Sequence, residues 1–301
     1  MSRSGVIIRS LAGFYDVKPE NEESADGAGV IRCRARGLFR RDGVSPLVGD
    51  RVLFDETGAG TGYLTELLPR RNSFVRPAVA NVDLLVVVAA GVNPVTDPYL
   101  IDRVTVIAAN NDCDVIIAVN KIDMDPAVNL MEIYGKTEYE LVPMSAITGE
   151  GIDRLRELID GHVSAFTGNS GVGKSSILNM LNPELEIPVG EVSEKLGRGR
   201  HTTRHVELFD LGGGTFIADT PGFASFDVER MEGIPKENLQ FCFPEFERHL
   251  ATCRYNDCAH LKEPGCNILE AVEAGEISGV RHESYERLYR LAAQVADWER
   301  N

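Results

Sequence analysis

The stretch Gly168-Asn169-Ser170-Gly171-Val172-Gly173-Lys174-Ser175 decides the fold, because it has the spacing of a phosphate-binding loop: a glycine, four free positions, then glycine, lysine and serine. Residues 162–167 before it form a short apolar run typical of a buried strand, and residues 176–181 after it have the apolar pattern of a helix. This order of strand, loop and helix is the context that the motif requires. The sequence therefore predicts a nucleoside-phosphate site within an α/β domain.

The predicted loop supplies three kinds of phosphate contact. Its glycines let successive backbone N–H groups face the phosphates, and the helix N-terminus adds positive potential. Lys174 is expected to reach the outer phosphates, and the Ser175 hydroxyl is expected to ligate Mg²⁺. We expect nucleotide contacts from the whole loop and from Ser176, which follows it. The alternative interpretation is a glycine-rich turn that happens to carry a lysine.

A second motif indicates which base the nucleotide carries. Asn120-Lys121-Ile122-Asp123 follows the apolar run 113–119, which reads as a parallel strand buried on both faces. The Asp123 carboxylate can accept hydrogen bonds from N1–H and the exocyclic amine of guanine, an edge that adenine lacks. After the next predicted strand, Ser145 and the backbone N–H of Ala146 can support the guanine carbonyl. Alone, the tetrapeptide could also be the start of a helix.

Two segments after the phosphate loop suit the magnesium ion. Asp219-Thr220-Pro221-Gly222 ends an apolar run, which places Asp219 to hold Mg²⁺ through water and the Gly222 N–H to sense the γ-phosphate. The glycine-rich, charged segment 197–205 contains Thr202 and Thr203, and one of these two could complete the Mg²⁺ shell. The sequence does not choose between them.

A cysteine and histidine cluster near the C-terminus predicts a zinc site. Cys253, Cys258, His260 and Cys266 are separated by four, one and five residues. Three thiolates and one imidazole make a closed tetrahedral Zn²⁺ site of the structural kind. The alternative is a set of reduced, unliganded cysteines, which is how we interpret Cys33, Cys113 and Cys242.

The N-terminal segment predicts a small β-barrel, with an OB-fold as a candidate. Residues 5–17, 30–39, 50–54 and 63–68 are short runs rich in β-forming residues and separated by turn formers. Arg32, Arg34 and Arg36 alternate along one of these runs, and Arg40 follows. Alternation puts the first three on one face, which suits either RNA binding or simple solvation.

Composition sets broad limits on function. The net charge is −15, which argues against general coating of nucleic acid, yet residues 1–74 carry eleven Lys and Arg against ten Asp and Glu. We therefore expect RNA contacts, if any, on local basic faces. The N-terminus has no apolar core, and no apolar run approaches the ~20 residues that span a bilayer. The sequence predicts a cytoplasmic protein without a membrane partner.

The order of the motifs indicates a circular permutation. The guanine elements at 120–123 and 145–146 precede the phosphate loop, and the magnesium elements follow it. With an N-terminal barrel and a C-terminal Cys/His cluster, the whole chain resembles the RsgA (YjeQ/EngC) family of GTPases, including residues 48–52 and 69–72 of the barrel. The resemblance implies an OB-fold at 1–74, a permuted α/β GTPase domain at 75–228 and a helical zinc domain at 229–301. It also implies GTP hydrolysis with GTP/GDP, Mg²⁺ and Zn²⁺, the 30S ribosomal subunit and its 16S rRNA as partners, and a monomer.

The catalytic candidates are Lys174 and His201. Phe223 stands where many GTPases place a glutamine that orients the attacking water, and phenylalanine cannot do so. The resemblance gives importance to the loop histidine that corresponds to His201, whose imidazole can orient or accept a proton from water. His201 could equally contact RNA or solvent.

Two other function classes stay open on the sequence alone. A metabolic P-loop kinase would need a second substrate pocket and would not need Asp123. An RNA-binding module regulated by nucleotide, with little turnover, is mildly favoured by Phe223.

Overall fold

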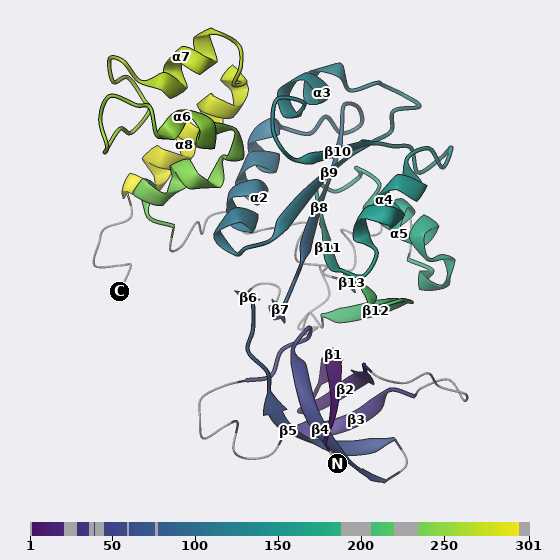
Figure 1. Ribbon diagram of the computed structural model, residues 1–301. Helices are drawn as coiled ribbons and strands as arrows, with labels where there is room; N and C mark the ends of the chain where they lie inside the picture. Colours follow the sequence, from purple (N-terminus) through teal and green to yellow (C-terminus); the bar gives the residue numbers. More distant parts are fainter. Residues whose placement is uncertain are drawn as a thin grey trace.

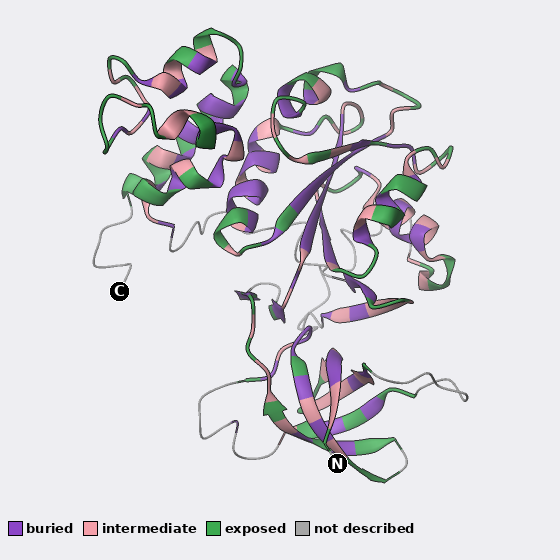
Figure 2. Cartoon of the chain, in the orientation of Figure 1, coloured by how far each residue is buried: buried purple, intermediate pink, exposed green. Residues whose placement is uncertain are grey.

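The computed structural model describes residues 2–20, 29–35, 39, 45–58, 60–75, 78–187, 206–219 and 234–294 of the chain. The described residues form an N-terminal barrel, a central sheet with helices on both faces, and a C-terminal helical region (Figure 1). Buried residues concentrate along the central strands and between the C-terminal helices (Figure 2). None of the described helices is long and apolar enough to cross a membrane.

Five strands close the N-terminal barrel. They are β1 (Arg3–Leu11), β2 (Phe14–Pro19), β3 (Ile31–Ala35), β4 (Arg51–Gly58) and β5 (Thr61–Leu67). They pair in the order β1-β2-β3-β5-β4, and β4 pairs back onto β1, so no edge is left unpaired. The sequence predicts one run over 5–17, and this is wrong: Ala12 and Gly13, both at positive φ, turn the chain between β1 and β2. The predicted barrel with an OB-like arrangement is confirmed.

The central sheet has five parallel strands followed by antiparallel β12, which also pairs with β1 of the barrel, Arg9 opposite Glu207. Its order is β10-β9-β8-β11-β13-β12. The strands are β8 (Leu84–Ala90), β9 (Asp114–Asn120), β10 (Glu140–Pro143), β11 (Val163–Thr167), β12 (Glu207–Gly212) and β13 (Thr215–Asp219). All seven residues of β8 are buried, as expected for a parallel strand covered on both faces. The sequence predicts that the adjacent runs 205–211 and 214–218 pair as a hairpin, and β12 and β13 do so.

Helices cover both faces of this sheet (Figure 1). They are α2 (Pro98–Asn110), α3 (Val128–Tyr134), α4 (Ile152–Ile159) and α5 (Lys174–Leu181), followed by a 3₁₀ turn, η1 (Pro183–Leu185). Side chains from alternate positions of β8 enter different cores: Leu85 and Val87 pack with α2 and α3, whereas Val86 and Val88 pack with α4 and α5. Three layers result, with the carboxyl ends of the parallel strands meeting at one edge of the sheet.

The C-terminal region consists of short helices around one long helix. It contains 3₁₀ helices η5 (Lys236–Cys242) and η6 (Pro244–Phe246), then α6 (Glu247–Leu250), α7 (Asn267–Glu273) and α8 (Gly279–Gln294). The sequence predicts one helix over 237–247, but Pro244 lacks the N–H that a continuous α-helix needs, and the segment divides. The helical spacing of Tyr285, Leu288, Leu291, Ala292, Val295 and Trp298 predicts an apolar stripe that packs in the core. Tyr285, Leu288 and Ala292 of α8 are buried, Leu291 is exposed, and Val295 and Trp298 lie outside the described residues.

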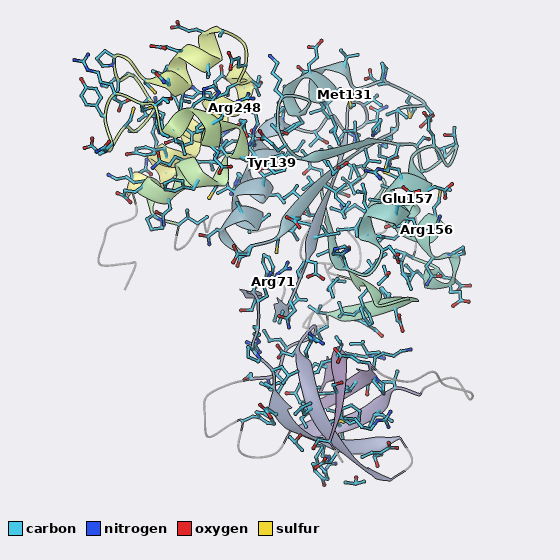
Figure 3. All side chains as sticks on the ribbon, viewed as in Figure 1. Arg71, Met131, Tyr139, Arg156, Glu157 and Arg248 are labelled. Carbon is cyan, nitrogen blue, oxygen red and sulfur yellow. The ribbon has the colours of Figure 1, made fainter. Side chains whose placement is uncertain are left out.

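A compact joint connects the barrel to the central sheet through a two-stranded ribbon, β6 (Ser73–Val75) and β7 (Ala78–Ala80). The fully buried carboxylate of Asp50 accepts two hydrogen bonds from Arg70, at 2.7 and 2.8 Å. Asn81 donates to the Gly49 carbonyl oxygen at 2.9 Å, and Arg71 lies at the same junction (Figure 3). Gly49, Asp50, Arg70 and Arg71 belong to the segments 48–52 and 69–72, so those segments, together with Asn81, form the connection between the two units.

Candidate functional site

The phosphate loop lies between β11 and α5, as the sequence predicts. Gly168, Gly171 and Gly173 all adopt positive φ, where other residues are strained. A Cβ at Gly168 would lie 2.2 Å from the Val88 carbonyl oxygen, and one at Gly173 would lie 2.3 Å from the Asn120 amide nitrogen. Gly168 and Gly173 must therefore be glycine for two reasons: their positive φ, and their close packing against β8 and β9.

Lys174 is the first residue of α5, and its ammonium group is held inside the loop. Its Nζ donates to the carbonyl oxygens of Gly168 at 2.5 Å and Asn169 at 2.8 Å. Burial lowers the pKa of Lys174 to about 8, because the surroundings disfavour its charged form. Ser175 and Ser176 occupy the same first helical turn. The helix N-terminus and this lysine together suit a bound anion.

Asn120 joins the guanine motif to the phosphate loop. Its Nδ2 donates to the Val172 carbonyl oxygen at 2.7 Å, and its Oδ1 accepts from the Ala146 N–H at 3.0 Å. One buried amide thereby connects three loops that lie far apart in the sequence. The structure brings together the predicted segments 120–123, 145–146 and 168–175.

The base-reading residues are held by their neighbours. The Ser145 hydroxyl donates to Asp123 Oδ1 at 2.5 Å, which fixes the carboxylate beside Ala146. Ser145 Oγ in turn accepts from the N–H groups of Ile147 and Thr148, both at 3.2 Å. A carboxylate held in place in this way can accept hydrogen bonds from the two neighbouring donors that guanine presents on its base edge. The Ser145–Asp123 contact is one that sequence reasoning missed.

The loop that follows β8 contacts the site through Asn93 and Pro94. Lys121 Nζ donates to the Asn93 carbonyl oxygen, and a Cβ at Gly171 would lie 3.4 Å from the Pro94 ring. Sequence reasoning assigned no role to residues 91–97. The signal available was only their position at the carboxyl end of a predicted parallel strand, where ligand sites of α/β sheets lie.

Part of the predicted magnesium site is placed by the structure. Asp219 ends β13, which runs parallel to β11 beside the phosphate loop, with Ala165 opposite Ala218. Ser175 lies at the start of α5. The side chain of Asp219 and all of His201, Thr202, Thr203, Gly222 and Phe223 lie outside the described residues, so their predicted roles stay predictions.

The four predicted zinc ligands come together. The ligand atoms of Cys253, Cys258, His260 and Cys266 all lie within 4.8 Å of one another. His260 Nδ1 is 3.3 Å from Cys266 Sγ and 3.6 Å from Cys253 Sγ. Ligands of a tetrahedral Zn²⁺ with bonds of ~2.0–2.3 Å are separated by about 3.3–3.8 Å. The two distances from His260 Nδ1 lie within that range and the two sulfur atoms of Cys253 and Cys266 are 4.0 Å apart, so the donor set is compatible with zinc.

Residues around the cluster orient its histidine. His260 Nε2 lies 2.8 Å from Gln240 Oε1, which leaves Nδ1 directed at the sulfur atoms. The His260 carbonyl oxygen accepts from His282 Nε2 at 2.7 Å, and Tyr285 donates to the Ala259 carbonyl oxygen at 3.0 Å. Such partners hold the ring orientation that a metal needs. Sequence reasoning missed Gln240 and assigned no role to His282, because neither has a spacing signal.

The other cysteines are packed thiols, as predicted. Burial raises the pKa of Cys33 and Cys242 to about 11 and that of Cys113 to about 12. These thiols therefore stay protonated at neutral pH.

A buried ion network attaches the C-terminal region to the central domain. Arg281 of α8 donates to Asp102 of α2 at 2.7 Å and makes two hydrogen bonds to Glu245 at 2.7 and 3.0 Å. All three side chains are essentially inaccessible to solvent. Tyr134 adds a bond from its hydroxyl to Asp102 at 2.7 Å, and Tyr139 lies beside the same contact (Figure 3). The C-terminal region that contains the Cys/His cluster is thus docked on the central domain through α2.

The predicted RNA-binding arginines are only partly placed. Arg32 and Arg34 are exposed on the outer face of β3. Arg32 Nε donates to Asp16 at 2.9 Å, and the Arg34 guanidinium lies over the Phe14 ring at 4.6 Å. Arg36 and Arg40 lie outside the described residues. No carboxylate neutralises Arg34 within the described part of the chain, whereas Arg32 is paired.

Comparisons with known proteins agree with this arrangement. Family models described as RsgA GTPase and RsgA N-terminal domain match residues 67–229 and 4–64. Proteins named small ribosomal subunit biogenesis GTPase RsgA are similar: that of Caldanaerobacter subterraneus is 43% identical over 95% of this chain and 94% of its own length. That of Ruminiclostridium cellulolyticum is 40% identical over 98% and 95%.

Two solved structures share the fold across the whole chain. YjeQ from Thermotoga maritima superposes with a TM-score of 0.82 at 32% identity, covering 98% of this chain and 100% of that one. YloQ, described as a circularly permuted GTPase, gives 0.81 at 33% identity, covering 97% and 96%. The permuted order of the motifs, their convergence on one site and these similarities together show that the chain belongs to the RsgA family of GTPases.

Proposed function

We propose that this GTPase binds the small (30S) ribosomal subunit and assists or checks its late maturation in the cytoplasm. The observation that carries the proposal is identity of 40% or more, over nearly the full chain, to proteins named for that process. The intact contact of Asn120 with both the phosphate loop and Ala146 supports it, because a chain that had lost GTP binding would not need this amide. A metabolic kinase is disfavoured, since the Ser145–Asp123 contact serves guanine recognition.

Within this proposal each loop has one task. The phosphate loop and Lys174 hold the phosphates, and Asp123, Ser145 and Ala146 select guanine. Ser175 and Asp219, with Thr202 or Thr203, would hold Mg²⁺, which neutralises charge on the phosphates when bound. His201 is the proposed residue that orients the attacking water, since Phe223 cannot.

One structural Zn²⁺ would be held by Cys253, Cys258, His260 and Cys266. Domain boundaries at 1–74, 75–228 and 229–301, 16S rRNA contacts and a monomeric state belong to the same proposal.

We further propose that nucleotide state is coupled to domain movement. Residues 219–228 connect the γ-phosphate segment directly to the zinc domain in sequence, because the permutation places the domain after it. The docking of α8 on α2 offers a second connection. Hydrogen exchange across 234–294 should therefore differ between GDP and a non-hydrolysable GTP analogue. Identical exchange in the two states would contradict the coupling.

Binding to ribosomal particles tests the proposed partner. The full chain is centrifuged through sucrose with purified 30S or 50S subunits, in the presence of GDP or a non-hydrolysable GTP analogue. We expect pelleting with 30S that is stronger in the GTP-analogue state, and none above background with 50S. Equal pelleting with both subunits, or none with 30S in either state, would contradict the proposal.

A further inference from the structure

Two carboxyl groups share one guanidinium group where α8 packs on α2. Arg281 donates to both oxygens of Glu245, from Nε at 2.7 Å and from Nη2 at 3.0 Å. It also donates from Nη1 to Asp102 Oδ1 at 2.7 Å. In the described part of the chain, neither carboxyl group forms an ion pair with another cation. With both ionised, one positive charge would face two negative charges, a net charge of −1.

The cluster of these three side chains is closed to solvent. Arg281 and Glu245 are 1% exposed, and Asp102 is 0% exposed. The rings of Phe243 and Tyr134 flank the guanidinium group, with their centroids 4.5 and 5.8 Å from its central carbon. An unbalanced charge is costly in such surroundings, because neither water nor a dissolved counter-ion reaches it. The packing therefore favours a cluster without net charge, which requires a proton on one of the two carboxyl groups.

The hydrogen bonds indicate which carboxyl group takes the proton. Glu245 accepts from the guanidinium group with both oxygens, which is the geometry of an ionised carboxylate. Asp102 accepts only through Oδ1, from Arg281 and from the Tyr134 hydroxyl at 2.7 Å. Its Oδ2 is buried and has no hydrogen-bond partner of normal geometry among the described residues. A proton on Oδ2 therefore disturbs none of the bonds that hold the cluster together.

Few groups face Asp102 from the elements around it. They are Arg281 and Ser284 of α8, Glu245 of η6, Tyr134 of α3, Tyr139 before β10, and Thr105 of α2 itself. Arg281 is the one cation in this set, and Arg103, the next residue of α2, instead places its guanidinium group over the Tyr99 ring. Burial raises the pKa of Asp102, and its effect exceeds that of the nearby positive charge and hydroxyl groups, which act in the opposite direction.

We propose that Asp102 holds a proton at neutral pH while the C-terminal region is docked on α2, and that it releases this proton when the region separates. A neutral Asp102 leaves Glu245 and Arg281 as a balanced ion pair. Docking of the C-terminal region is then linked to the binding of one proton. This inference concerns the docking contact alone and does not depend on the proposed ribosomal partner.

The pH dependence of docking follows from this linkage. An exposed aspartate has a pKa of about 3.9, so above about pH 4 the separated form has lost a proton that the docked form keeps. Because burial raises the pKa of Asp102 in the docked form, docking weakens as the pH rises from about 4 towards that raised pKa. The equilibrium constant for docking falls by up to about tenfold per pH unit in this window.

Infrared spectroscopy of the full chain at about pH 7 detects the proton directly, because a protonated carboxyl group has a C=O stretching band distinct from that of a carboxylate. We expect such a band to shift when the aspartates carry ¹³C and to disappear in Asp102→Asn. Glu245→Gln should also remove it, because Asp102 alone would then balance Arg281. Absence of the band in the wild type, or a shift with ¹³C-glutamate instead, would overturn the assignment to Asp102.

Hydrogen exchange of residues 279–294, corrected for intrinsic rates, measures the linkage between about pH 6.5 and 8.5. The protection of the wild type divided by that of Asp102→Asn should fall as the pH rises, by up to about tenfold per unit, because only the wild type releases the proton. This ratio cancels other titrating groups. Glu283→Gln, at an exposed position of the same helix, should keep the wild-type profile. A ratio that is constant or rises with pH would contradict the linkage, and the infrared measurement on the labelled wild type stands even if a variant fails to fold.

Discussion

Asn120 shows how much one side chain contributes to the nucleotide site. It accepts from one loop and donates to another, so the base-reading and phosphate-binding parts depend on the same amide. Gly173 packs against that amide so closely that no side chain fits. We therefore expect guanine selection and phosphate binding to be coupled through Asn120.

Gly173→Ala should weaken GDP binding by about tenfold or more. The new Cβ would lie 2.3 Å from Asn120 Nδ2, at a backbone φ of 101° that costs an alanine ~1–2 kcal/mol. Titration with a fluorescent GDP analogue measures the effect. Gly214→Ala in the β12–β13 turn is the control, because it has a similar φ of 82° but nothing within 4 Å. Undiminished GDP affinity in Gly173→Ala would show that the Asn120 contact is dispensable.

Lys174 gives the site a pH dependence. Its pKa is lowered to about 8 by burial in the free protein, and bound phosphates should raise it by favouring the charged form. At pH values above about 8, GDP binding should therefore take up a proton and weaken as the pH rises, whereas at about pH 7 the lysine is charged in both states. The folding stability of the nucleotide-free protein has the opposite pH dependence. Between about pH 8 and pH 10.5 the unfolded chain keeps the Lys174 proton that the folded chain has lost, so the free energy of unfolding rises with pH in this range.

Calorimetry in two buffers of different ionisation enthalpy measures that proton. The apparent binding enthalpy of GDP should depend on the buffer at about pH 8.5 but not at about pH 7. Guanosine, which lacks phosphates, should show no such dependence. A buffer-independent enthalpy for GDP at both pH values would mean that Lys174 does not change protonation on binding.

Helix α8 connects the region of the Cys/His cluster to the central domain. One of its faces presents Tyr285 and Leu288 to the C-terminal core, and the same face carries Arg281 into the contact with α2. That core also contains Tyr99 and Val106 of α2, so the two units share apolar packing around the ion network. A movement of the zinc region away from α2 would have to expose these buried charges.

Arg281→Met should destabilise the C-terminal region by about 3–5 kcal/mol, because it leaves Asp102 and Glu245 buried without their partner. Urea unfolding followed by circular dichroism measures the change, and hydrogen exchange across 234–294 assigns it to this part of the chain. Arg290→Met is the control on the same helix: its pair with Glu286 is exposed, so the change should be within about 0.5 kcal/mol. Equal transitions in both variants would show that the buried network does not hold the region.

Across the whole molecule, the parts that sequence predicted are those with a local signature. The phosphate loop, the guanine motif and the Cys/His cluster each have a fixed spacing that the chemistry requires, and continuous apolar runs marked the strands of the central sheet. Contacts between residues far apart in the sequence could not be predicted in this way. Arg281 and Asp102 are 179 positions apart, and nothing in their local sequence pairs them, although an arginine on the apolar stripe of a helix could have indicated a buried partner.

The joint between barrel and central sheet shows the same limit. Segments 48–52 and 69–72 were part of the family resemblance in the sequence. Their structural role, which is to join the barrel to the central sheet, became clear only from the ion pair between Asp50 and Arg70. Likewise the alternation of Arg32 and Arg34 along β3 made the two side chains look equivalent. Their cross-strand neighbours differ, because Arg32 is paired with the Asp16 carboxylate whereas the Arg34 guanidinium lies over the Phe14 ring. The turn at Ala12 and Gly13 and the division of 237–247 at Pro244 differ, because a glycine and a proline signalled both of them locally and the prediction passed them over.

We propose that this GTPase hydrolyses GTP in response to the small ribosomal subunit. Phosphate release by the full chain, from GTP and from ATP and with and without purified 30S subunits, measures this response. We expect slow release from GTP alone, because Phe223 cannot orient water, strong stimulation by 30S, and no stimulated release from ATP. GTP turnover that 30S leaves unchanged, or equal turnover of ATP, would show that the proposed response does not exist.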